Sequence, residues 1–225
     1  MNSGDQIDVK ESRVPVGGEG RLPAAPVTAS GVLRRPERSE TGVWIGIAAI
    51  SMSFAAFTSA MIVRQGASAD WRHFELPRIL YLNTLILIGS SVTLRMACAR
   101  LAFVAGLGSE APDAARKPFL DGIYWMYVTA ALGALFVVGQ VLAWRDLVAQ
   151  GLFLATNPSC SFFYVFTALH GLHLLGGIGG LTYIIRKLSK THGTAHTSGI
   201  GAVSVYWHFM DGLWVYLFLL LAMRT

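Results

Sequence analysis

The sequence predicts an all-α fold: a polytopic membrane bundle of five transmembrane helices, with the N-terminus in the cytoplasm and the C-terminus outside. Of the 225 residues, 53% are apolar and only 14% are charged, and the mean hydropathy is +0.51. An ordinary soluble domain carries about a quarter charged residues. The charges are gathered in a few stretches, which leave five apolar segments near the ~20 residues that a membrane-spanning helix needs.

The chain divides into a tail, 1–40, and a transmembrane domain, 41–225. The tail contains several Pro, Gly and Ser residues with six acidic and six basic residues, so it cannot bury enough apolar surface to become ordered. It also lacks a charged start followed by an apolar core, which argues against a signal peptide. The five predicted helices cover residues 43–63, 76–98, 121–144, 160–185 and 201–223.

The second predicted helix has the shortest charge-free run, because Arg78 and Arg95 fall inside it. Both lie near its predicted ends. Long basic side chains in such positions can extend to the lipid head groups, so the segment still suits a membrane span.

The distribution of Lys and Arg predicts the orientation. The tail has six, the stretch 95–120 has four and the stretch 186–200 has three, which makes thirteen on one side against five on the other. Basic residues concentrate in cytoplasmic loops, so the side with thirteen is predicted to be cytoplasmic.

Two other classes of function find little support. The net charge is +5, but no basic helix face interleaved with aromatics is evident, so no nucleic-acid partner is expected. The only cysteines, Cys98 and Cys160, are predicted to lie toward opposite ends of the bundle, so we expect no disulfide and interpret both as packing residues.

Two polar pairs interrupt the last two apolar segments: His170 with His173, and His208 with Asp211. An ionised Asp at the centre of a bilayer costs about 2.5–3.5 kcal/mol on insertion scales, so such residues need partners inside the bundle. Spacing of i, i+3 places each pair on one helix face. The rise of ~1.5 Å per residue puts the two pairs at similar depth.

Three interpretations remain for these four residues. They could bind a metal or haem, since imidazole and carboxylate suit iron, copper and zinc. They could relay protons. They could also hydrogen-bond between helices and fix the packing, as polar residues in membrane bundles commonly do. Packing is favoured over metal, because spacing alone does not make the ligands converge.

The stretch after the fourth helix contains Arg186, Lys187, Lys190, His192 and His196 without an acidic residue. Basic groups at the membrane surface suit an anionic phospholipid head group. Ordinary positive-inside topology explains the same pattern equally well.

Three stretches carry a resemblance to a known family. They are Leu-Pro at 76–77 with Leu-Asn-Thr-Leu-Ile-Leu at 82–87, Ser-Phe-Phe-Tyr-Val-Phe-Thr-Ala-Leu-His-Gly-Leu-His at 161–173, and Val-Tyr-Trp-His-Phe-Met-Asp-Gly-Leu-Trp at 205–214. From about residue 76 onward, and more loosely from 43, the chain resembles subunit III of cytochrome c oxidase and its relatives in quinol oxidase and nitric oxide reductase systems. The last two stretches are specific in combination.

The resemblance implies an all-helical subunit that packs beside the catalytic subunit I, with subunit II in the same complex, in the bacterial plasma membrane. It implies that haem and copper belong to those partners, and that this chain holds no metal or cofactor, binds phospholipid and supports proton uptake. Arg186 and His196 match positions where relatives contact a phospholipid head group. The intramembrane His and Asp residues are not metal ligands in the family.

Two departures from the family pattern stand out. Longer relatives have seven helices, and the first two have no counterpart here. Many relatives carry a buried glutamate in the helix equivalent to 43–63, where Met52 stands in this chain. Any role of that carboxylate therefore does not transfer.

The expected function is that of the non-catalytic subunit III of a haem-copper cytochrome c oxidase. The alternatives are a subunit III-like component of a quinol oxidase or nitric oxide reductase, or a stand-alone membrane metalloprotein using the four polar residues. A transporter is disfavoured, because no inverted repeat or broken helix is evident.

Overall fold

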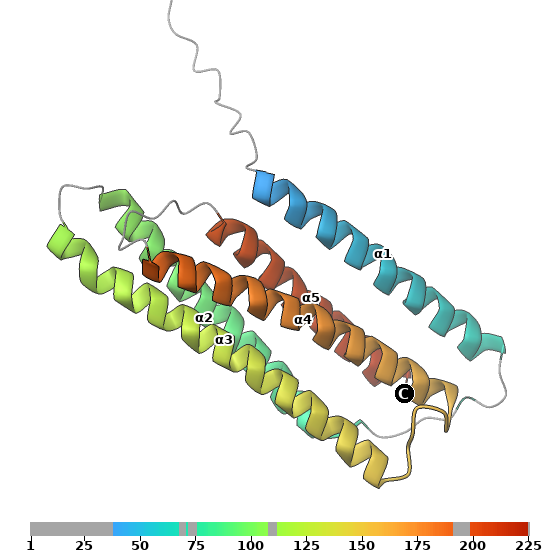
Figure 1. Ribbon diagram of the computed structural model, residues 1–225. Helices are drawn as coiled ribbons and strands as arrows, with labels where there is room; N and C mark the ends of the chain where they lie inside the picture. The colour runs from blue at the N-terminus through green and yellow to red at the C-terminus, as the bar shows by residue number, and fades with distance from the viewer. Residues whose placement is uncertain (1–37, 68–70, 72–75, 108–111, 191–198, 225) are drawn as a thin grey trace, which may run out of the picture. The chain divides into compact units, whose positions relative to one another are not determined.

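The computed structural model describes residues 38–67, 71, 76–107, 112–190 and 199–224, and these form five long helices (Figure 1). They are α1 (Arg38–Ala67), α2 (Ile79–Leu107), α3 (Pro112–Ala149), α4 (Pro158–Lys190) and α5 (Ile200–Arg224). Each helix is long and apolar enough to cross a membrane, and the described part of the chain contains no strand. The predicted five-helix membrane fold is confirmed. Most of the predicted tail, 1–40, lies outside the described residues.

The helices are longer than the apolar segments that predicted them. The second helix was expected at 76–98, but α2 begins at Ile79, after a turn in which the Leu80 N–H donates to the Pro77 carbonyl, and runs on to Leu107. The third was expected at 121–144 and spans Pro112–Ala149. Hydropathy marks the part of a helix that suits hydrocarbon, whereas backbone hydrogen bonding continues into the head-group region, where charged side chains are tolerated.

The connection between α3 and α4 is defined by a glycine and a proline. Gly151 has φ +78°, and the Leu152 N–H donates to the Leu147 carbonyl, as in a Schellman cap that ends a helix. Pro158 then occupies the first position of α4, where its missing N–H costs nothing. These two residues let the chain turn back and return antiparallel to α3.

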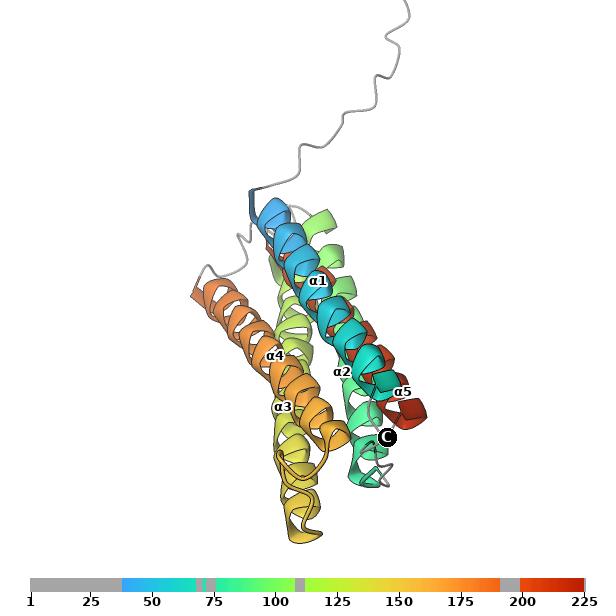
Figure 2. The same cartoon turned by 90° about the vertical axis from the view of Figure 1, so that its right-hand side faces the viewer.

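Four helices form a closed ring and the fifth packs on its outside. Contacts join α2 to α3, α3 to α4, α4 to α5 and α5 to α2. Helix α1 contacts only α5 and α4 and lies along α5 (Figures 1 and 2). Over the described residues, α1 and α2 do not contact each other.

Trp207 of α5 is in contact with each of the other three ring helices. Its indole N–H donates to Ser90 Oγ of α2 at 3.0 Å, and the side chain is fully buried. On α3, a Cβ added to Gly133 would lie 2.8 Å from the Trp207 ring; on α4, a Cβ added to Gly177 would lie 3.6 Å from it. The glycines therefore leave space for the indole at the centre of the ring.

Candidate functional site

His170 lies inside the ring between two aromatic side chains. Its ring centroid is 5.7 Å from that of Phe136 on α3 and 5.0 Å from that of Trp214 on α5. The side chain is fully buried, and neither imidazole nitrogen has a hydrogen-bond partner in the described part of the chain. His170 therefore packs in the core between the four helices. It makes no hydrogen bond to the other three predicted polar residues.

His173, one turn further along α4, faces a different neighbour. Its Nδ1 is 2.7 Å from the Leu169 carbonyl of the same helix, and its ring lies 6.0 Å from that of Phe54 on α1. The backbone carbonyl of His173 accepts a hydrogen bond from Tyr206 of α5 at 2.9 Å. His173 therefore belongs to the contact between the ring and α1.

His208 and Asp211 lie at the contact between α5 and α2. Nδ1 of His208 is 2.6 Å from Ser91 Oγ of α2. Asp211 is 7% exposed, and Ser91 is also close to its carboxylate. Neither carboxylate oxygen has a partner among the described residues at the geometry of a hydrogen bond.

The four polar residues thus have three separate surroundings, of which His208 and Asp211 share one beside Ser91. They face the ring core, α1 and α2, and the described residues include no group of three or more His, Cys, Asp or Glu side chains placed to hold a metal. Of these four, only His208 makes a side-chain hydrogen bond to another helix within the described residues.

Most of the side-chain hydrogen bonds between helices are made by residues that the sequence analysis did not single out. The indoles of three tryptophans donate to hydroxyl groups on neighbouring helices, and hydroxyl pairs join two further contacts: Trp207 to Ser90, Trp214 to Thr84, Trp144 to Thr167, Thr93 with Thr129, and Tyr216 to Thr58. A buried indole N–H needs an acceptor. Tryptophans in the middle of apolar segments, with Ser or Thr in neighbouring ones, were the available signal.

The two residues predicted to bind lipid lie at the end of α4 and beyond it. Arg186 is exposed, with Lys187 and Lys190 in the last turn of the helix. His196 lies outside the described residues, so its position relative to Arg186 stays a prediction.

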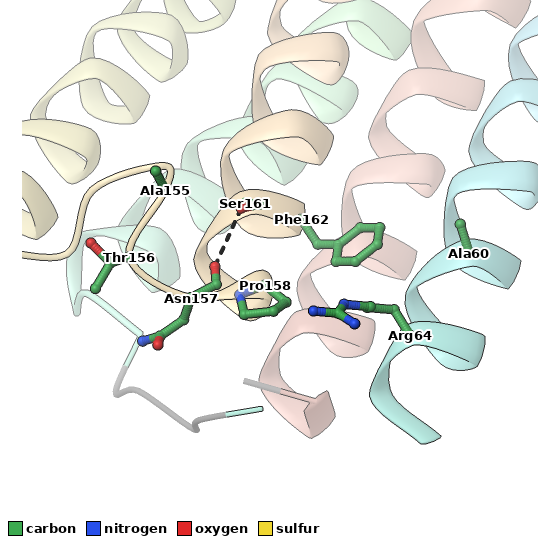
Figure 3. A pocket seen from close by; sticks show the side chains of 8 residues that line it. All are labelled: Ala60, Arg64, Ala155, Thr156, Asn157, Pro158, Ser161 and Phe162. Carbon is green, nitrogen blue, oxygen red and sulfur yellow. Dashed lines mark hydrogen bonds between the residues drawn. The ribbon is translucent and has the colours of Figure 1, made fainter. Parts of the chain in front are cut away.

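A pocket of about 580 Å³ lies at the opposite end of α4, between that helix and α1 (Figure 3). Arg64 extends from α1 across it toward Phe162, so a cation stands over an apolar surface. The lining residues come from α1, the α3–α4 connection and the start of α4: Ala60, Arg64, Ala155, Thr156, Asn157, Pro158, Ser161 and Phe162.

Comparison with known proteins identifies the family of this chain. The sequence model of the family described as cytochrome c oxidase subunit III matches residues 46–224. The chain belongs to the cytochrome c oxidase subunit III family. The resemblance seen in the motifs at 161–173 and 205–214 is confirmed.

Individual members of the subunit III family match over most of their length. The cytochrome c oxidase subunit 3 of Thermostichus vulcanus is 32% identical, over 84% of this chain and 89% of its own. That of Corynebacterium diphtheriae is 29% identical, over 83% and 88%, and that of Synechocystis is 29% identical, over 87% and 79%. The chain is therefore similar to bacterial subunit III proteins as a whole, and its membership places it in an oxidoreductase complex with other subunits.

Proposed function

We propose that this chain is the non-catalytic subunit III of a bacterial haem-copper terminal oxidase that uses cytochrome c. It spans the plasma membrane beside catalytic subunit I and subunit II, which hold the haem and copper, and it stabilises subunit I during turnover. The observation that carries this proposal is the use of the polar groups inside the bundle. Indoles and hydroxyls join the helices to one another, while His170, His173 and the pair His208 and Asp211 lie in three separate surroundings.

A stabilising role is supported by the surface of the bundle. Large apolar side chains are exposed along the outer faces of the helices, among them Leu85 on α2, Leu135 on α3 and Leu172 on α4. Such a surface suits lipid and neighbouring transmembrane helices, and it has little to offer a soluble substrate.

Phospholipid binding is proposed at both ends of α4. At one end Arg186 and His196 supply basic groups for an anionic head group. At the other end Arg64 stands over the apolar floor formed by Pro158 and Phe162, a combination that suits a phosphate with its acyl chains.

Support of proton uptake follows from the proposed orientation. The thirteen basic residues on the predicted cytoplasmic side would favour anionic lipid around the entrance of the proton path in subunit I. This chain would act on proton uptake through its lipid and its contact with subunit I, since Met52 replaces the buried glutamate of many relatives.

Two alternative functions can be tested separately. A copper-binding subunit II gene next to this one favours cytochrome c as the donor over a quinol oxidase or nitric oxide reductase. Stoichiometric metal on the isolated chain would support the stand-alone metalloprotein instead.

The proposed role is tested by purifying the oxidase from a strain that lacks this chain and following oxygen consumption over many turnovers. We expect a similar initial rate and a markedly faster loss of activity than in the complete enzyme. An equal lifetime in both preparations would contradict the stabilising role.

Lipid analysis of the Arg64→Met and Arg186→Met variants tests the lipid sites, with Arg100→Met as the control, because Arg100 is paired with Asp121.

A further inference from the structure

One exposed face of the bundle carries polar groups within the membrane span. On α5, Gly201, Val205, His208 and Gly212 follow one another at spacings of four, three and four, which places them along one side of the helix. All four are exposed or half-buried. Beside them on α2 are half-buried Ser91 and exposed Arg95. These six residues are called the α2–α5 face.

Contacts between the two helices show how far along the bundle Arg95 lies. Ser91 bonds to His208, and one turn further along α2 from Arg95 the thiol of Cys98 contacts the side chain of Ser204. Arg95 is therefore level with the stretch of α5 between those two contacts, about 9 Å along the axis from the start of α5 at Ile200. It also falls within the apolar span Ile79–Gly106 of α2.

The polar groups of this face have unused bonding capacity. Arg95 is close enough to His208 to interact with it electrostatically, but the two carry charge of the same sign when His208 is protonated. Among the described residues, Arg95 makes no ion pair, and His208 uses only Nδ1, which leaves Nε2 without a hydrogen bond. A cation and an unpaired ring nitrogen at this depth call for an acceptor from outside the chain, because hydrocarbon supplies none.

The shape of the face suits a helix better than lipid. Gly201 and Gly212 flank His208 on the same side of α5, and a Cβ added to Gly212 would meet nothing within 4 Å. Bare backbone of this kind allows a second helix to approach closely. The outer face of α3 differs, because it presents Tyr127, Leu135 and other large side chains that lipid can cover.

We propose that the α2–α5 face is the surface on which a transmembrane helix of a partner subunit docks, with a carboxylate of that helix opposite Arg95. This inference rests on the proposed function, since it names the face through which the chain joins its complex. The glycines set the close approach, Arg95 supplies the charge, and Nε2 of His208 supplies a second polar contact.

Photo-cross-linking in native membranes tests the docking face. A benzophenone amino acid is placed at Val205, on the α2–α5 face, or at Leu135, which is exposed on α3. The two positions have similar depth, because Gly133 contacts Trp207 and each position is two residues from one of these. We expect Val205 to yield an adduct with another membrane subunit and Leu135 to yield lipid adducts only. Lipid adducts alone at Val205, or equal protein adducts at both positions, would overturn the proposal in favour of a lipid-covered face.

Arg95→Met tests the charge, with Arg100→Met as a matched loss of one cation on the same helix. We expect Arg95→Met to lower the amount of partner subunit recovered per tagged chain by about threefold to tenfold, and Arg100→Met to change it little. Equal recovery for both variants would refute the ion pair.

Haem recovered with the wild-type chain tests the proposed function separately. If haem is recovered but Val205 gives no protein adduct, the subunit assignment stands and the docking face fails.

Discussion

At the scale of single residues, close packing around Trp207 explains more of how the helices associate than the charged groups do. The indole bonds to Ser90 and lies against Gly133 and Gly177, so one side chain is in contact with three neighbouring helices. Membrane helices gain little from burying apolar surface against one another, because lipid is equally apolar. Association then depends on fitted packing and on hydrogen bonds such as the one to Ser90.

Substitution of Gly133 by Ala tests this packing. The added Cβ would lie 2.8 Å from the Trp207 ring, and the fully buried indole has little room to move, so we expect the free energy of unfolding to fall by about 1–3 kcal/mol. Unfolding in mixed micelles with increasing SDS measures it. Gly179→Ala is the control, since a Cβ there meets nothing within 4 Å. Equal effects of the two substitutions would show that Trp207 does not constrain Gly133.

The predicted site residues show which part of residue-scale structure a sequence can supply. Spacing and composition identified His170, His173, His208 and Asp211 as polar groups inside the membrane, and the structure places all four on α4 and α5. Spacing did not reveal their neighbours. His170 and His173 are one turn apart, yet one contacts Phe136 and the other contacts Phe54, because the rings extend to different sides of α4.

At the scale of helices, α1 is attached differently from the other four. It packs outside the ring, and polar contacts hold its second half to α5: Tyr216 donates to Thr58 Oγ1 at 3.1 Å, and Arg224 donates to Gln65 Oε1 at 3.0 Å. Trp71, just beyond α1, donates to the backbone carbonyl of Arg224. These bonds lie toward one end of the helix.

A double-mutant cycle with Thr58→Val and Tyr216→Phe tests this attachment. We expect a coupling energy of about 0.6 kcal/mol, and at most about 1.7, as measured for hydrogen bonds between membrane helices. The free energy of unfolding of each variant provides the four values. Thr182→Val replaces Thr58→Val in the control cycle, because Thr182 donates to the Gly179 carbonyl of its own helix, and those effects should add. A coupling of zero for Thr58 and Tyr216 would argue against the bond.

Helix number was predictable from the sequence, whereas helix ends and neighbours were not. Five apolar segments gave five helices, but α2 and α3 run well beyond the predicted spans 76–98 and 121–144. Arg100, in the extension of α2, forms an ion pair at 3.2 Å with Asp121 at the first position of the predicted span 121–144, and both are partly exposed. Hydropathy cannot identify such helical extensions, because charged residues suit a helix at the membrane surface as well as they suit a loop.

At the scale of the whole molecule, the orientation proposed from thirteen basic residues on one side is open to a direct test. In a background with Cys98→Ala and Cys160→Ser, Ala155→Cys places one thiol in the exposed α3–α4 connection, and Thr41→Cys places one in the exposed first part of α1. We expect a membrane-impermeant maleimide to label Ala155→Cys in intact spheroplasts and Thr41→Cys only after permeabilisation. The reverse pattern would invert the topology.

The motifs at 161–173 and 205–214 allowed the family to be predicted from the sequence, since together they are specific. The α2–α5 face required the structure. Arg95 looked like a residue near a helix end until α2 proved to continue to Leu107, and its proximity to His208 depends on the closure of the ring between α2 and α5.

The most direct measurement is affinity purification of the tagged chain from its native membrane in mild detergent, followed by an absorption spectrum and metal analysis. The subunit III assignment predicts that haem and a large catalytic subunit are recovered with the chain, and that the chain separated from them carries neither haem nor metal. Recovery of the chain without haem, or with stoichiometric metal of its own, would contradict it.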